Sequence, residues 1–519
     1  MRDNSRQWSV LFLVLAVLFG GMVRFAPAVL GQFPINDGGM FYTMIGDLRA
    51  NGFALPAETS YNYLGIPYAY PPLSLYAGAL LSALGIPTME VIRWLPALVS
   101  TLSILAFYWM ATQMLGAGSI AALSTLAYAL MPRSFSWYVM GGGLSRGLGM
   151  LFLLLTCGAV WIMFSRPGLR VTLLAAVCGA GAVLSHPETA LHTVAACLLI
   201  WLFRGRTASS VRSALIVAAG ALVLTSPWWV TVLIHNGFGT VVSALSAGGH
   251  SPYFWTSWLT MDFSEERYVT WLTVLGLLGF VIQSIKRQWF LPVWLLLPFA
   301  VEPRSAPAIA ALPLAVLAGS GLADFVIPGV SSLVSGAKTA EADWTHLFMR
   351  SRAVKVVTSY IVLAALVGAF SYDLALARYI VPVASRRAMQ WVRENTPAGA
   401  RFLVLTSHSD PFSDPSAEWF PALAERTSSN TIQGQEWTLG QNFMPFLTAL
   451  QDLPMCLTAD PACLETWAAD HGAKFDYVYL QTADSLVAWP SGLLLYQLRQ
   501  DPNYTLVFEN EGIAIFQRK

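Results

Sequence analysis

The segment that follows the first long apolar stretch carries an acidic residue in a setting suited to chemistry. Asp37 lies between Asn36 and two glycines, Gly38 and Gly39. Glycines permit a tight turn and let a ligand approach the backbone closely, so Asp37 is a candidate general base or metal ligand. Asp also favours the N-cap of a helix, and residues 40–51 have an amphipathic helical pattern. The two roles are compatible, and Asp37 is the principal candidate for catalysis.

Other side chains typical of binding sites occur where apolar segments end. Arg304 can hold a phosphate group through two parallel hydrogen bonds, and the alternative is an ion pair with Glu302. His186 and Glu188 form a compact acid–imidazole group that could hold a metal ion together with Asp37. No strict ligand spacing supports this metal site, and the alternative is a helix start with an acid that favours the helix dipole.

Two further candidates for substrate binding lie in the same region as Asp37. Asp47 follows it on the amphipathic helix, and Tyr70 opens a later apolar stretch. The alternative for Asp47, two residues before Arg49, is a solvated charge on the protein surface.

Composition places the chain in a membrane. Of its 519 residues, 55% are hydrophobic and only 11% are charged, and the mean hydropathy is +0.56. Soluble globular domains do not have such a composition, so the sequence predicts a polytopic α-helical membrane protein. The formal charge of +1 gives no indication of nucleic-acid binding.

About eleven apolar stretches could cross the membrane, although several are shorter than the ~20 residues that a bilayer usually requires. They are residues 8–30, 90–114, 117–131, 146–165, 171–185, 189–203, 213–234, 267–285, 289–301, 305–327 and 354–376. A further apolar stretch, 67–85, decides the topology. If it does not cross, five short basic clusters all lie on the side of the N-terminus, as expected for cytoplasmic loops. These clusters are Arg2/Arg6, Arg166/Arg170, Arg204/Arg206/Arg212, Lys286/Arg287 and Lys338 to Lys355. We therefore predict a juxtamembrane or re-entrant helix at 67–85 and a cytoplasmic N-terminus in the cell membrane.

This topology divides the chain into a transmembrane domain, 1–379, and an extracytoplasmic domain, 380–519. Residues 31–89 form the first outer loop of the transmembrane domain, and 132–145 and 235–266 also lie outside. Arg133 and Arg146 then flank three glycines on the outer side, against the usual trend for basic residues. Their position indicates an anionic ligand.

The C-terminal domain has the pattern of a small α/β fold. A helical pattern ends at Pro397, and Cys456 and Cys463 can form a disulfide if the domain faces an oxidising compartment. Strands are predicted at 401–406, 477–480, 504–508 and 512–516.

The order of features in the first outer loop resembles that of C-type (GT-C) membrane glycosyltransferases. Asp37 and two glycines are followed by an amphipathic run to Phe53, and Tyr70-Pro71-Pro72 then opens another apolar stretch. The superfamily includes protein O-mannosyltransferases and aminoarabinose transferases, which use sugars linked to polyprenyl phosphate. The resemblance implies transfer of a sugar from such a lipid to a glycan, lipid or protein acceptor on the extracytoplasmic face.

By this resemblance, Asp37 acts on the acceptor or on a divalent metal such as Mg²⁺ or Mn²⁺. Arg304, together with Arg146, would hold the donor phosphate. Many GT-C members place a second acidic residue in the second outer loop. Residues 132–145 contain none, so the sequence departs from the usual two-carboxylate metal site.

Two other functions stay open. A transporter or flippase of lipid-linked glycans would carry paired charges deep within its spans and inverted repeats, whereas the charges here lie mainly at the ends of spans. A non-catalytic membrane scaffold would tolerate the loss of Asp37.

Overall fold

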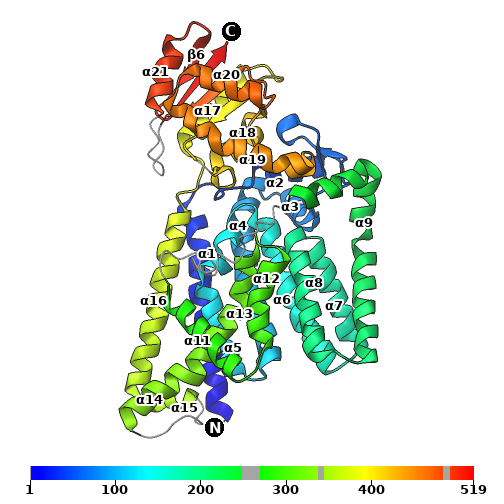
Figure 1. Cartoon of the computed structure of the whole chain (residues 1–519), viewed down its shortest axis with the longest axis vertical. Helices are drawn as coiled ribbons and strands as arrows, with labels where there is room; N and C mark the ends of the chain where they lie inside the picture. Colours follow the sequence, from blue (N-terminus) through cyan, green and yellow to red (C-terminus); the bar gives the residue numbers. More distant parts are fainter. Residues whose placement is uncertain (1, 248–268, 337–343, 409, 483–490) are drawn as a thin grey trace.

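The computed structural model describes residues 2–247, 269–336, 344–408, 410–482 and 491–519. Figure 1 shows a long helical part that contains the N-terminus and, at its other end, a smaller part with the β-sheet and the C-terminus. Most of the predicted outer segment 235–266 lies outside the described residues.

The helical part is a bundle of apolar helices. Among the described residues, six helical stretches are long and apolar enough to cross a membrane. They are α1 (Arg2–Leu30), α4 (Thr88–Leu115), α6 (Gly143–Ser165), α9 (Ala208–Ala247), the continuous α13 (Ala306–Gly321) to α14 (Ile327–Ser335), and α16 (Arg352–Leu376). Shorter helices at the other predicted spans are α5 (Gly118–Leu130), α7 (Leu169–Val183), α8 (Pro187–Arg204), α11 (Trp271–Ile285) and α12 (Phe290–Val301). The protein is a multi-pass helical membrane protein, and the count of eleven spans stays a prediction.

Small residues let the helices in the middle of the bundle approach one another closely. Every residue of α13 is buried, and this helix packs against α5, α11 and α12. A Cβ at Gly279 of α11 would lie 2.2 Å from the carbonyl oxygen of Leu317, and one at Gly319 would lie 2.2 Å from Ser124 Oγ. Close contact between small residues is the usual way for helices to associate in a membrane.

The first outer loop lies on the end of the bundle that faces the C-terminal domain (Figure 1). It contains α2 (Gly39–Ala50), a small hairpin and α3 (Leu73–Ala83). The 11 residues of α3 extend about 16 Å, whereas a bilayer core is about 30 Å thick. Leu73 N donates to the oxygen of Leu184, just after α7, and Ser82 bonds to Thr88 at the start of α4. These contacts favour the predicted juxtamembrane position of residues 67–85.

The C-terminal part follows α16 and begins with α17 (Val383–Asn395). Its five-stranded sheet has the order β4-β3-β5-β7-β6, with β3 parallel to β4 and β5, and β7 antiparallel to β5 and β6. The strands are β3 (Arg401–Leu405), β4 (Thr427–Ser428), β5 (Tyr477–Gln481), β6 (Tyr504–Glu509) and β7 (Ile513–Arg518). All four predicted strands are present, and β4 is an addition. The predicted fold class, a polytopic helical protein with a small α/β part, is confirmed.

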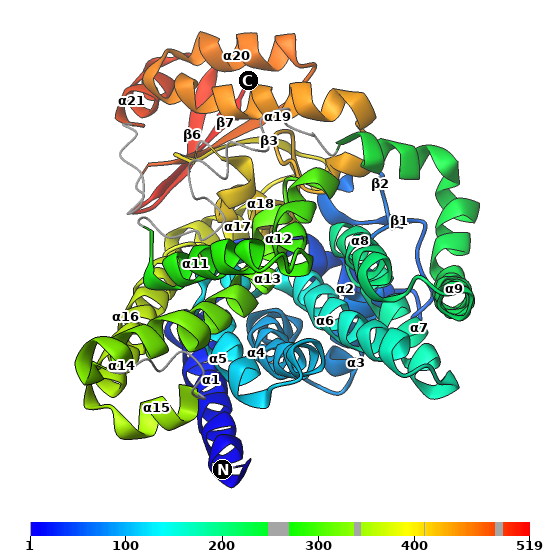
Figure 2. The ribbon, with the colours of Figure 1, turned by 60° about the horizontal axis from the view of Figure 1, so that its bottom comes forward.

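Helices cover both faces of this sheet. They are α18 (Pro415–Ala424), α19 (Phe443–Asp452), α20 (Pro461–Asp470) and α21 (Gly492–Gln500). Figure 2 shows α19 and α20 over the face away from the bundle, while α17 and α18 lie between the sheet and the membrane helices. The central strands β3 and β5 are almost wholly buried, as is usual for parallel strands covered on two sides.

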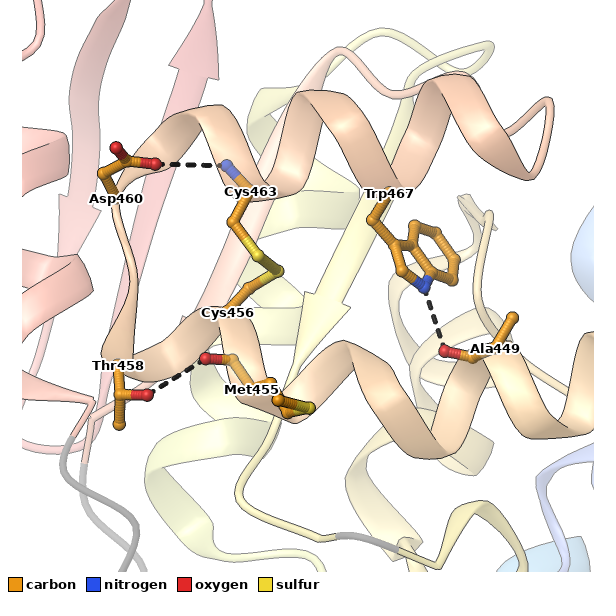
Figure 3. The surroundings of a disulfide bond; sticks show 7 residues. All are labelled: Ala449, Met455, Cys456, Thr458, Asp460, Cys463 and Trp467. Carbon is orange, nitrogen blue, oxygen red and sulfur yellow. Dashed lines mark hydrogen bonds between the residues drawn. A yellow bond between two sulfur atoms is a disulfide. The ribbon is translucent and has the colours of Figure 1, made fainter.

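The disulfide between Cys456 and Cys463 that the sequence left open is present (Figure 3). Cys456 lies in a 3-10 turn after α19, and Cys463 lies in the first turn of α20. Asp460 caps α20 by accepting a hydrogen bond from Cys463 N, and the indole of Trp467 donates to the oxygen of Ala449 in α19. The disulfide therefore joins the turn after α19 to α20, and the hydrogen bond of Trp467 joins α20 to α19 itself.

Candidate functional site

The loop that carries Asp37 is held by close backbone contacts. Asn36 and Gly38 have positive φ angles of 54° and 138°, and the second strongly favours glycine. Gly141 N donates to the oxygen of Ile35, and a Cβ at Gly141 would lie 1.8 Å from the oxygen of Asp37. The glycines therefore allow the first two outer segments to touch, which fixes the position of Asp37.

Both oxygens of the Asp37 carboxylate accept hydrogen bonds from the start of α6 and its N-cap residue. Arg146 Nη2 lies 2.6 Å from Oδ2, and Gly142 N lies 2.9 Å from Oδ1. The side chain of Asp37 is 17% exposed and that of Arg146 is 24% exposed. Asp37 does not cap α2, whose N-cap is Gly38. It instead bonds to the backbone at the start of α6, which is a favourable position for a carboxylate.

Arg146 is positioned by three groups. Besides its ion pair with Asp37, its Nε donates to the oxygen of Trp137, and its guanidinium lies 5.3 Å from the centre of the Trp137 ring. Planar stacking and a carboxylate partner fix the orientation of the guanidinium fork. Arg133 lies in the short 3-10 helix Pro132–Ser134, which follows α5, and it stays a predicted binding residue.

A second acid–base pair joins α8 to the turn between α12 and α13. Arg304 Nη1 lies 3.7 Å from Glu188 Oε1, and its guanidinium lies 4.7 Å from the ring centre of Phe412 in the C-terminal domain. The ion pair of Arg304 with Glu302 that the sequence left open is not the one observed. Glu302 instead accepts hydrogen bonds from the backbone of Arg304 and from Ser305 N and Oγ, at 2.6–3.0 Å.

Tyr70 is a buried residue whose pKa responds to the charges of both ion pairs. Its ring lies 5.1 Å from that of Phe41, and burial raises the pKa of its hydroxyl well above the usual value. Charges from both pairs, those of Arg146, Glu188 and Asp37, also act on this pKa. Tyr70 therefore keeps its proton. Burial also raises the pKa of Glu436 in the C-terminal domain, and the charges of Arg304 and Glu188 act on that pKa as well.

The predicted metal site of Asp37, His186 and Glu188 is not assembled. Nδ1 of His186 faces the backbone and hydroxyl of Thr189 at 3.4 and 3.1 Å, so this side chain caps α8. Glu188 pairs with Arg304, and both oxygens of Asp37 are engaged. Within the described ranges, no three His, Cys, Asp or Glu side chains gather in a way that could hold a metal ion. These residues therefore do not fit a divalent cation.

Asp47 makes local structural contacts, and its role in substrate binding stays a prediction. Its carboxylate accepts hydrogen bonds from Thr59 Oγ1 at 2.6 Å and from Ser60 N and Oγ at 2.9 and 2.6 Å. These bonds tie the hairpin of the outer loop to α2. The network gives this acid a structural role on the protein surface.

The sequence did not reveal that the C-terminal domain holds the Asp37 loop. Glu418 of α18 is 2% exposed and accepts hydrogen bonds from Gly39 N at 2.9 Å and Met40 N at 3.1 Å, at the start of α2. Burial, and then the nearby charge of Asp37, raise the pKa of Glu418 to about 8. The indole of Trp419 donates to the oxygen of Asn36. Glu418 and Trp419 thus hold the loop in addition to Arg146.

Comparison with solved structures identifies this arrangement of membrane helices, outer loop and α/β domain as the GT-C fold. The chain is similar to the oligosaccharyltransferase of Archaeoglobus fulgidus solved with Zn and sulfate (15% identity, 98% of this chain and 73% of that chain, TM-score 0.52). It is also similar to ArnT from Cupriavidus metallidurans bound to undecaprenyl phosphate (14% identity, 98% of both chains, TM-score 0.51).

A third similar structure is the mycobacterial arabinofuranosyltransferase AftD (16% identity, TM-score 0.53); the match covers 99% of this chain but only 41% of AftD. No family model matches the sequence, and no curated protein matches it in sequence. At such low identities the similarity shows the fold alone. It confirms the GT-C architecture that the first outer loop suggested.

Proposed function

We propose that this protein is a glycosyltransferase that moves a sugar from a polyprenyl-phosphate-linked donor to an acceptor at the extracytoplasmic surface of the cell membrane. The observation that carries this proposal is the ion pair of Asp37 with Arg146, next to the pair of Arg304 with Glu188. A carboxylate and two guanidinium groups supply the base and the phosphate-binding groups that such a transfer requires. The undecaprenyl phosphate bound to ArnT supports the class of donor.

Arg304 and Arg146 act on the leaving group. As the bond between the anomeric carbon and the phosphate oxygen breaks, both electrons remain on the polyprenyl phosphate, whose negative charge increases. The Arg304 side chain is 55% exposed, so its guanidinium can donate hydrogen bonds to a phosphate. Glu188 and Phe412 hold the guanidinium in place. Arg146 is held by Asp37, so in this proposal it links the base to the group that binds the phosphate.

Asp37 acts on the acceptor. The acceptor hydroxyl oxygen bonds to the anomeric carbon, and its proton passes to the Asp37 carboxylate. An ionised carboxylate offers about four acceptor positions, and Arg146 and Gly142 occupy two of them. Asp37 can therefore accept a third hydrogen bond without losing the contacts that orient it. No step is assigned to a divalent cation, because the described residues do not present a set of ligands for one.

Sugar transfer from radiolabelled polyprenyl-phosphate donors tests this function. Membranes would contain the wild type, Asp37→Asn, or the control Asp470→Asn, which changes an exposed acid in the C-terminal domain. Asn at position 37 keeps an acceptor for Gly142 but loses the charge. We expect Asp37→Asn to lower transfer by a factor of about 100 or more, within the usual range for a general base, and Asp470→Asn to leave it unchanged.

The other outcomes are equally informative once expression and fold of all three proteins have been checked. Equal transfer by the wild type and Asp37→Asn would remove Asp37 from the mechanism. Transfer by none of them, across a panel of lipid-linked sugars, would favour a transporter or a scaffold.

A further inference from the structure

A cavity with both polar and apolar lining residues lies where α16 joins the C-terminal domain. Its volume is about 320 Å³, and its wall includes Arg378 just after α16, Arg386 of α17, His408 and Gln481. None of Asp37, Arg146 and Arg304 lines it, so it is distinct from the candidate glycosyltransferase site.

The sheet topology explains why a cavity forms here. The chain passes from β3 to β4 on one side of β3, and then returns to form β5 on the other side. In open α/β sheets, ligands bind beyond the carboxyl ends of the strands at such a reversal of strand order. His408 lies three residues after β3, and Gln481 is the last residue of β5. The cavity is therefore at the switch point of the sheet.

The chemistry of the wall suits an anion. Arg378 is exposed, and Nε of Arg386 is buried without a hydrogen-bond partner among the described residues. Val383, the first residue of the 13-residue helix α17, also lines the cavity, and no described side chain caps this helix. Free amides at a helix N-terminus attract anions. The described lining residues include no Asp or Glu.

We propose that this cavity binds a phosphate group, and that the group belongs to the headgroup of an anionic phospholipid in the outer leaflet. Arg378 is two residues beyond the end of α16, so the cavity is close to the level at which this helix leaves the membrane. Ile380 and Val381 supply an apolar wall beside the two arginines. A bound headgroup would link α16 to α17 and so steady the domain that carries Glu418. This proposal is independent of the transfer reaction.

Thermal unfolding of the full chain in detergent micelles tests the proposal. The micelles would contain phosphatidylglycerol, phosphatidylcholine, or inorganic phosphate without added lipid. We expect phosphatidylglycerol, and not the other two, to raise the Tm. In Arg386→Gln and Arg378→Gln, the concentration of phosphatidylglycerol that gives half of this rise should increase by about tenfold or more, as expected for loss of one charged hydrogen bond. Arg387→Gln is the matched control, because it removes the same charge from an exposed neighbour on α17 that does not line the cavity.

A fourth variant keeps the test decisive if Arg386→Gln folds poorly. Val383 is 53% exposed, and Val383→Glu places a carboxylate where the dipole of α17 favours it, so the protein should remain folded. The new charge occupies the cavity and should abolish the rise in Tm. The proposal would be overturned if Arg386→Gln, Arg378→Gln and Val383→Glu responded to phosphatidylglycerol as the wild type does. It would also be overturned if the wild type responded equally to both lipids. A rise with inorganic phosphate alone would overturn the assignment to a lipid.

Discussion

Replacing Glu418 by Gln tests whether the C-terminal domain holds the Asp37 loop through a buried carboxyl group. The two oxygens of Glu418 accept hydrogen bonds from Gly39 N and Met40 N. Gln has only one carbonyl oxygen, so one of these buried N–H groups loses its acceptor. An unsatisfied buried donor costs about 1–3 kcal/mol, which sets the expected loss of stability where the Glu418 carboxyl is protonated.

The size of this effect should depend on pH. Burial and Asp37 raise the pKa of Glu418 to about 8 in the folded protein, from 4.5 for an unperturbed carboxyl group. Between these values the folded state binds more protons than the unfolded state. The stabilising contribution is therefore complete below about pH 4.5 and is lost as the pH rises to about 8. At 1.36 kcal/mol per pKa unit, the whole change is on the order of 5 kcal/mol.

Gln cannot titrate, so the Glu418→Gln variant lacks this part of the pH dependence. We expect its Tm to lie below that of the wild type near pH 5, and the difference to shrink or change sign by pH 9. Thermal unfolding in detergent at a series of pH values measures this directly. Glu425→Gln is the control, because it makes the same change at an exposed residue that pairs with Arg393 only on the surface. A difference in Tm between wild type and Glu418→Gln that stays constant from pH 5 to 9 would refute the reasoning.

Three further changes have expected outcomes. Arg304→Gln should raise the KM for the polyprenyl-phosphate donor about tenfold or more, because it removes an exposed guanidinium that we assign to the phosphate. The Tm should not change. Radiolabelled transfer at varied donor concentration measures the KM. Arg24→Met should destabilise the bundle by about 1–3 kcal/mol, because this fully buried side chain of α1 donates to two serine hydroxyls and two backbone carbonyls that would lose a donor; an unchanged Tm would contradict that role. Reducing the disulfide between Cys456 and Cys463 with dithiothreitol should destabilise the C-terminal domain by about 2–3 kcal/mol. The stability of the Cys456→Ser variant, which lacks the disulfide, should not change with dithiothreitol.

Features that depend on neighbouring residues could be predicted from the sequence. Long apolar runs gave the membrane helices, whereas the position of residues 67–85 on one side of the membrane, inferred from the basic residues, stays a prediction. Alternating apolar patterns located the four longer strands. Cys456 and Cys463 lie only 7 positions apart in a polar segment, so their disulfide was also a local inference. Each of these signals reflects the environment of a single segment.

The partners in the candidate site could not be predicted, because they come from segments far apart in the chain. Asp37 and Arg146 were both chosen as candidates, but nothing in the sequence pairs them across 109 positions. Arg304 pairs with Glu188 and not with the adjacent Glu302, since the oxygens of Glu302 are turned to the backbone of its own turn. The metal hypothesis met the same difficulty: the acids and the imidazole that it combined are each engaged by other groups in the structure.

The Asp37 loop lies between two supports, and this arrangement makes the site depend on the whole chain. Arg146 and the glycine turn at Gly141 hold the loop from the membrane part of the chain. Glu418 and Trp419 hold it from the C-terminal domain. Membrane helices alone would supply only the first support, leaving two N–H groups at the start of α2 without their acceptor. The C-terminal domain therefore positions the proposed base as well as covering it, so a change that weakens the docking of this domain should reduce transfer without altering any group that touches the substrate.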